Sequence, residues 1–115
     1  MAHVLQRADL RLNPPSRTVE YQGEPYDSSV SFFVIDNDTP GSGPDLHRHP
    51  YCEVFVIHEG RARFTAGDLQ VEAGREDIIV VAPDEPHGFV NLGPETLQMV
   101  CIHEHGRMIT EWLNT

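Results

Sequence analysis

The stretch GSGPDLHRHPYCEVFVIHEG, residues 41–60, decides how this chain folds and what it can bind. It contains two histidines and a glutamate, His47, His49 and Glu53, whose positions differ by even numbers. Side chains of a β-strand alternate between the two faces with period 2, so these three can point to the same side. Imidazole nitrogens and a carboxylate that converge on one point form a ligand set for a divalent transition metal.

A fourth candidate ligand, His87, lies much further along the chain, as expected if a second pair of strands crosses the same cavity. The sequence therefore predicts one ion held by His47, His49, Glu53 and His87. Iron, manganese, nickel, copper and zinc are all compatible with three imidazoles and one carboxylate, so the ion is not specified. Such a set leaves one or two positions of an octahedral ion open.

Short apolar runs alternate with Gly, Pro, Asn and Asp along most of the chain. This rhythm is typical of an all-β sandwich or barrel with tight turns. Hairpin turns are expected at Glu59-Gly60 and at residues 66–68, and a loop over residues 36–44 leads to the first histidine. The expected strands are Thr18–Tyr21, Ser29–Ile35, Tyr51–His58, Arg61–Thr65, Leu69–Glu72, Asp77–Val81, His87–Asn91 and Thr96–His103.

One helical pattern remains, near the C-terminal end. Met108 and Trp112 are spaced i, i+4, and Ile109 and Leu113 repeat this spacing, which makes an apolar stripe on a helix. The pattern predicts a short helix over Arg107–Leu113 that lies on the barrel or on a partner subunit.

The pattern as a whole resembles the cupin superfamily. The first cupin motif, G-x5-H-x-H-x3/4-E-x6-G, matches at Gly41, His47, His49, Glu53 and Gly60.

The second cupin motif is usually G-x5-P-x-G-x2-H-x3-N, and His87 and Asn91 match it. Ala82 stands where the proline is expected, and Asp84 replaces the turn glycine. These departures affect the turn before His87 rather than the histidine itself.

The resemblance implies a double-stranded β-helix, or jelly roll, formed by one domain over residues 1–115 with its metal-site core at 41–91. It also implies a homodimer and a metal bound inside the barrel by His47, His49, Glu53 and His87.

Several apolar side chains share strand parity with these ligands and are expected to line the same pocket. They are Tyr51, Phe55, Ile57, Phe89 and Met99. Plain core packing is the alternative for each, and both roles can hold together because ligand pockets are mostly apolar.

His103 shares its parity with Met99 and Cys101 and is the best candidate for a catalytic or substrate-contacting group outside the ligand set. The alternative is a surface histidine or one satisfied by other contacts. Cys52 has the opposite parity to Glu53, so it should face away from the metal, and both cysteines are expected to pack as small apolar residues.

Composition restricts the partners. The chain has 115 residues and a formal net charge of −10, which disfavours nucleic acid and anionic membranes, since both need a basic surface. Two cysteines do not suggest a disulfide framework, and neither a signal peptide nor a membrane-spanning run is expected. A reducing cytoplasm is therefore the expected location.

Two classes of function fit these features. The first is an enzyme whose metal binds a small oxygenated or anionic molecule, acting as a dioxygenase or as a metal-assisted isomerase or lyase. The second is a non-catalytic module that binds or senses a small molecule in the same barrel.

Overall fold

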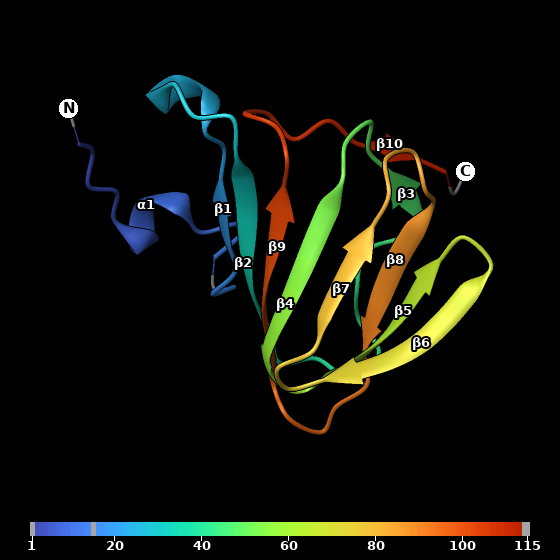
Figure 1. Cartoon of the computed structure of the whole chain (residues 1–115). Helices are drawn as coiled ribbons and strands as arrows, with labels where there is room; N and C mark the ends of the chain where they lie inside the picture. Colours follow the sequence, from blue (N-terminus) through green and yellow to red (C-terminus); the bar gives the residue numbers. More distant parts are fainter. Residues whose placement is uncertain (1, 15, 114–115) are drawn as a thin grey trace.

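A computed structural model describes residues 2–14 and 16–113. These residues form two five-stranded antiparallel sheets, with strand orders β1-β2-β9-β4-β7 and β10-β3-β8-β5-β6 (Figure 1). The elements are α1 (Arg7–Leu10), β1 (Val19–Tyr21), the 3-10 helix η1 (Glu24–Tyr26), β2 (Ser31–Asn37), β3 (His47–Arg48), β4 (Glu53–Glu59), β5 (Arg61–Ala66), β6 (Leu69–Gly74), β7 (Ile78–Val81), β8 (His87–Asn91), β9 (Leu97–His103) and β10 (Glu111–Trp112). The predicted all-β jelly roll is confirmed.

Strict alternation in the central strands builds the core between the two sheets. In β9 every second residue from Leu97 to His103 is buried, and β4 repeats this pattern from Glu53 to Ile57. Side chains from both sheets meet inside, where Phe55 of β4 lies edge-on to Phe64 of β5 with ring centroids 5.0 Å apart. This alternation is why the strands could be located from the sequence.

Strand register places the inward side chains of the first sheet in three layers. The first layer is polar, the second mainly aromatic and the third aliphatic, and neighbouring layers lie ~7 Å apart along the strands. From β4 through β9 to β2 they are Glu53–His103–Ser31 (the polar layer), Phe55–Cys101–Phe33 (the aromatic layer) and Ile57–Met99–Ile35 (the aliphatic layer).

The second sheet follows the same order. His87 pairs with His47 of β3 and with Ala66 of β5 opposite the polar layer, and Phe89 pairs with Phe64 beside the aromatic layer. The fold therefore places polar groups at one level of the barrel and closes the barrel below them with apolar side chains.

Each predicted strand overlaps an observed one. The strand β3 was not predicted, because a two-residue strand carries no periodicity. Among the described residues, no helix has the length and apolar character needed to cross a membrane.

The predicted C-terminal helix over Arg107–Leu113 is wrong. Glu111 and Trp112 form β10 instead, which pairs with Arg48 and His47 of β3. A segment of this length gains little from helix formation on its own. The extended form gains ladder pairing and lets the N–H of Met108 donate to Gln22 Oε1 at 3.0 Å, so tertiary contacts override the local pattern.

Candidate metal centre

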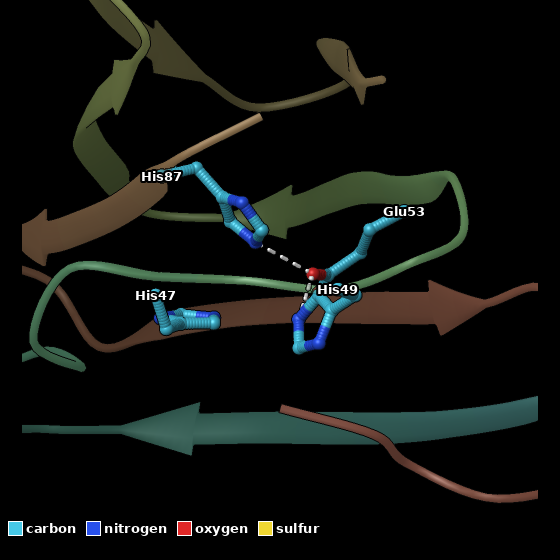
Figure 2. Close-up of side chains that lie close together, drawn as sticks. All are labelled: His47, His49, Glu53 and His87. Carbon is cyan, nitrogen blue, oxygen red and sulfur yellow. Dashed lines mark hydrogen bonds and ion pairs between the residues drawn. The ribbon is translucent and has the colours of Figure 1, made fainter. Parts of the chain in front are cut away.

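Four side chains from separate elements converge inside the barrel (Figure 2). His47 lies on β3, His49 follows that strand, and Glu53 and His87 are the first residues of β4 and β8. Their candidate ligand atoms all lie within 4.8 Å of one another. All four are buried, none with more than 7% of its surface exposed. The two halves of the predicted ligand set therefore come together in space.

The glutamate stands at the centre of this group. Its Oε1 atom lies 3.0 Å from His49 Nε2 and 2.9 Å from His87 Nε2, as the dashed lines in Figure 2 mark. Two histidines and a carboxylate thus present their ligand atoms to one small volume.

Backbone carbonyls orient all three histidines. The Nδ1 atom of His47 lies 2.7 Å from the carbonyl oxygen of Asp45, and that of His87 lies 2.8 Å from the carbonyl of Glu85. His49 Nδ1 lies 2.8 Å from the carbonyl of Ile109 in the C-terminal segment. Because a carbonyl only accepts, each Nδ1 carries a proton, which makes Nε2 the nitrogen of each ring that is available to a metal.

Unpaired nitrogens beside Glu53 indicate that the site fits an ion. His49 Nε2 is buried and has no hydrogen-bond partner, although a Glu53 oxygen lies 3.0 Å away, and His103 Nε2 is likewise buried and unpaired. The contact of His49 Nε2 with Glu53 is short but not aligned as a hydrogen bond, and a buried unpaired nitrogen is costly. An ion between the rings would satisfy this nitrogen, so the buried cluster of His47, His49, Glu53 and His87 fits a divalent metal site.

The electrostatics of the cluster keep the carboxylate ionised. Burial raises the pKa of Glu53, but its contacts with His103, His49 and His87 outweigh burial and hold that pKa far below its usual range. Burial lowers the pKa of His47 and keeps this imidazole neutral at pH 7. Burial also acts to lower the pKa of His87, but the contacts of this ring with Glu53 and Glu85 together outweigh burial and raise that pKa. Metal binding requires an ionised carboxylate and neutral imidazoles, so an ion would bind in competition with a proton at His87.

The altered turn before His87 still delivers the histidine to the site. Asp84 has φ 63°, the left-handed conformation for which glycine is usual and which aspartate tolerates. Its N–H donates to the carbonyl of His49 at 2.7 Å. The replacement of the consensus glycine is therefore compatible with the turn, which is tied directly to a candidate ligand.

A fourth histidine, outside the ligand set, contacts the other oxygen of the glutamate. His103 Nε2 lies 3.1 Å from Glu53 Oε2, and His103 Nδ1 lies 2.6 Å from the hydroxyl of Tyr51. This hydroxyl accepts the N–H of Ile109 at 3.1 Å, and burial raises the pKa of Tyr51 to about 12, so it keeps its proton. Tyr51 can therefore donate to Nδ1, which leaves the Nε2 proton of His103 facing the carboxylate.

His103 should accordingly act as a positioning residue for Glu53. Replacing His103 with alanine is expected to weaken metal binding by roughly tenfold to a hundredfold, the usual cost of losing a partner of a metal ligand. His103→Gln should recover part of the loss, because its amide keeps a polar N–H group beside Oε2. Chelator competition measures the affinity, and the visible absorption of the cobalt-loaded protein reports the coordination.

The matched control is Cys101→Ala, which removes a buried side chain from the same strand and face without touching the carboxylate. Equal metal affinities for the wild type and His103→Ala would contradict this role.

A cavity of about 230 Å³ leads from the metal cluster to the surface. It passes Phe33 and Phe55 of the aromatic layer and Phe89 of the second sheet. Its further lining comes from both sheets and from the N- and C-terminal segments. The remaining lining residues are Leu12, Thr18, Ile35, Pro44, His47, His49, Glu53, Cys101, His103, Thr110 and Trp112.

The predicted pocket residues separate into two groups. Phe55 and Phe89 line the cavity, whereas Tyr51, Ile57 and Met99 do not. Ile57 and Met99 belong to the fully buried aliphatic layer beneath it, and Tyr51 turns its hydroxyl to His103. Strand parity predicts which side chains point into the barrel, but it does not predict how far the cavity extends along the barrel.

Other lining residues had no signal in the sequence. Leu12, Thr18, Thr110 and Trp112 reach the cavity from segments outside the central strands. Cys101 also lines it, and burial raises the pKa of its thiol well above the ordinary value, so the thiol is neutral.

Comparisons with known proteins agree with this architecture. In Methanocaldococcus jannaschii, the uncharacterized protein MJ1618 is 34% identical over 62 residues, 53% of this chain, and the matched region spans 50% of that protein. A solved uncharacterized protein with a double-stranded β-helix domain from Klebsiella pneumoniae matches over 100% of both chains, with a TM-score of 0.74 and 17% identity.

Oxalate decarboxylases share the fold as well. The Lactobacillus farciminis enzyme, solved as a formate complex, gives a TM-score of 0.78 at 18% identity over 92% of this chain and 34% of its own. The Bacillus subtilis enzyme, studied for its Mn(II) centres, gives 0.75 at 19% identity over 84% of this chain and 27% of its own. At these identities the likeness concerns the fold alone.

A family profile identifies the fold independently. The profile of the cupin domain matches residues 35–103, which include all four candidate ligands and the strands that carry them. A single domain over the full 115 residues stays a prediction. With the motif, the barrel and this match in agreement, the chain belongs to the cupin family.

Proposed function

We propose that this protein is a metal-dependent enzyme that acts on a small oxygenated or anionic molecule. The observation that carries the proposal is that three of the four candidate ligands, His47, His49 and Glu53, line a cavity that reaches the surface. A purely structural metal site is closed on all sides, whereas a catalytic site keeps a position open to substrate.

The four residues leave up to two positions of an octahedral ion for substrate. A divalent ion with one carboxylate keeps about one unit of positive charge, and when bound it supplies Lewis acidity or redox chemistry. His47, His49, Glu53 and His87 would hold it. His103 and Tyr51 fix the carboxylate, and the aromatic layer excludes water from one side of the site.

The reaction class is dioxygenation, or a metal-assisted isomerase or lyase step. The experiment is elemental analysis of protein purified without a nickel column, followed by activity screens with each metal. Oxygen consumption with iron or manganese but not zinc would favour dioxygenation. Turnover with redox-inert ions would favour isomerase or lyase chemistry.

A second candidate function is a non-catalytic module that binds or senses a small molecule. One observation favours it: apart from the candidate ligands, His103 is the sole histidine or carboxylate among the described residues that line the cavity. This histidine is already engaged by Tyr51 and Glu53. Ligand-induced thermal stabilisation without product would identify a binding module.

We also propose that the chain forms a homodimer through the outer face of its first sheet. Register aligns two apolar rows across four strands on this face, and Ile78 and Val80 at its edge are 63% and 64% exposed. The rows are Phe32–Ile102–Val54–Val80 and Val34–Val100–Val56–Ile78. An antiparallel sheet usually leaves one face polar, and two-fold pairing would bury the patch on both copies at once.

This dimer predicts that Val80→Asp yields monomers, because a carboxylate would be buried without a partner in the interface. Light scattering coupled to size-exclusion chromatography measures the mass. Leu69→Asp is the matched control, since Leu69 is 61% exposed but lies on β6 of the other sheet. A monomeric wild type, or a Val80→Asp variant that stays dimeric, would refute this interface.

A cytoplasmic location stays a prediction, in keeping with two free thiols.

A further inference from the structure

We infer that the preferred ligand of this site is a monoanion with an apolar body, such as an aryl or branched-alkyl 2-oxo acid or its enolate, and that dicarboxylates such as oxalate are disfavoured. The inference rests on the proposed metal-binding function. It follows from the side chains that line the cavity beside the metal cluster, and from the placement of the arginines.

The cavity wall beside the metal is apolar. An occupant that reaches one layer below the cluster meets the rings of Phe33, Phe55 and Phe89 and the neutral thiol of Cys101. Of these, Phe55 and Phe89 have ring centroids 6.1 Å apart in an edge-to-face arrangement. Such walls favour an aromatic or branched hydrocarbon group and offer no hydrogen bonds to a second carboxylate.

Charge balance points the same way. A divalent ion with Glu53 carries about one positive charge, which a monoanion neutralises and a dianion exceeds. The excess negative charge would lie in an apolar cavity, where an unpaired charge is strongly disfavoured. The chain's net charge of −10 adds repulsion against dianions at longer range.

No lysine or arginine is among the described residues that line the cavity, and the arginines next to lining residues in the sequence have partners of their own. Arg11, next to Leu12, donates to the carbonyl of Ser16 at 2.9 Å. Arg48, between two candidate ligands, forms an ion pair with Glu111 of β10. Arg17, next to Thr18, pairs with Asp36 at 3.4 Å and has 72% of its side chain exposed. A carboxylate that does not bind the metal therefore has no cation to meet inside the site.

The size of the cavity limits the body of the ligand. A volume of about 230 Å³ corresponds to roughly eight waters at ~30 Å³ each, so the occupant has on the order of ten non-hydrogen atoms. Ile57 and Met99 of the aliphatic layer are fully buried and lie outside the lining, whereas Ile35 of the same layer lines the cavity. A longer chain would therefore extend towards the lining residues of the terminal segments, Leu12 and Trp112.

The test compares three 2-oxo acids, which share one chelating head, with oxalate, which chelates through two carboxylates. Isothermal titration of the full manganese-loaded chain without oxygen would measure pyruvate, 4-methyl-2-oxopentanoate, phenylpyruvate and oxalate. The two acids with apolar bodies are expected to bind about tenfold or more tightly than pyruvate, since only they fill the aromatic layer. Oxalate is expected to bind no better than pyruvate.

A substitution tests whether the aromatic layer causes this preference for ligands with apolar bodies. Cys101→Leu enlarges a side chain in the aromatic layer and should remove most of the preference for phenylpyruvate over pyruvate while the metal content stays unchanged. Val100→Leu is the matched control, because this neighbour on β9 faces outward and should keep the preference.

Two outcomes would overturn the inference while the metal site stands: oxalate binding as tightly as phenylpyruvate, or a metal-loaded protein that binds none of the 2-oxo acids. A chain that takes up no divalent metal would instead refute the proposed function itself. Metal content is measured on every sample, which keeps the two failures distinct.

Discussion

Replacing Glu53 with alanine is expected to reduce bound metal to well below one ion per chain. This carboxylate is the sole anionic side chain among the described residues that line the cavity, and two imidazoles approach its Oε1 atom within 3.0 Å. Without it a divalent ion keeps its full charge in an apolar site. His49→Ala should have the same effect, because it removes one of the ligand nitrogens. Elemental analysis after incubation with each divalent ion measures the loss.

The control for this experiment is His58→Ala. His58 belongs to the same strand as Glu53, but its side chain is exposed and lies outside the cluster. This variant should keep the metal content of the wild type. Full occupancy in both Glu53→Ala and His49→Ala would show that the ion, if present, lies elsewhere.

Removing the metal should also destabilise the fold. An ion present at about 100 times its dissociation constant stabilises the folded state by about 2.7 kcal/mol, and an ion that leaves takes this contribution away. For a chain of this size the melting temperature should fall by roughly 10 °C. The reason lies in the cluster itself, since His49 Nε2 is then again buried without a partner. Differential scanning calorimetry before and after chelation measures the difference.

Glu53→Ala is the internal control here, since added metal should no longer raise its melting temperature. A wild-type melting temperature that does not change after metal stripping, verified by elemental analysis, would argue against this coupling between site and fold.

The ligand set was predictable because its information is local. His47, His49 and Glu53 share a parity, and even spacing on extended chain puts them on one face whatever the rest of the molecule does. His87 could be added because motif spacing in the cupin family links it to the first three. The strands were predictable for the same reason, since the sequence of each segment alone shows the alternation of apolar and polar residues with period 2.

The partners of those ligands were not predictable in this way. Parity marked His103 as an inward residue, but only the pairing of β4 with β9 places it opposite Glu53. The contact between Tyr51 and His103 joins residues 52 positions apart, and that between His49 and the Ile109 carbonyl joins residues 60 apart. Such contacts depend on the register between strands, which no single segment encodes.

The C-terminal segment shows where local reasoning gives a wrong answer. Its i, i+4 apolar pairs fit a helix, yet pairing with β3 and the bonds at Met108 and Ile109 hold it extended against the metal cluster. The sequence by itself determined the strands, their inward faces and the four candidate ligands, since these follow from periodicity along the chain. The tertiary structure alone decided the hydrogen bonds that orient the ligands, the residues that line the cavity and the conformation of the last strand. Each of these is set by free energies of contact between distant segments, which outweigh the small local preferences of a short stretch of chain.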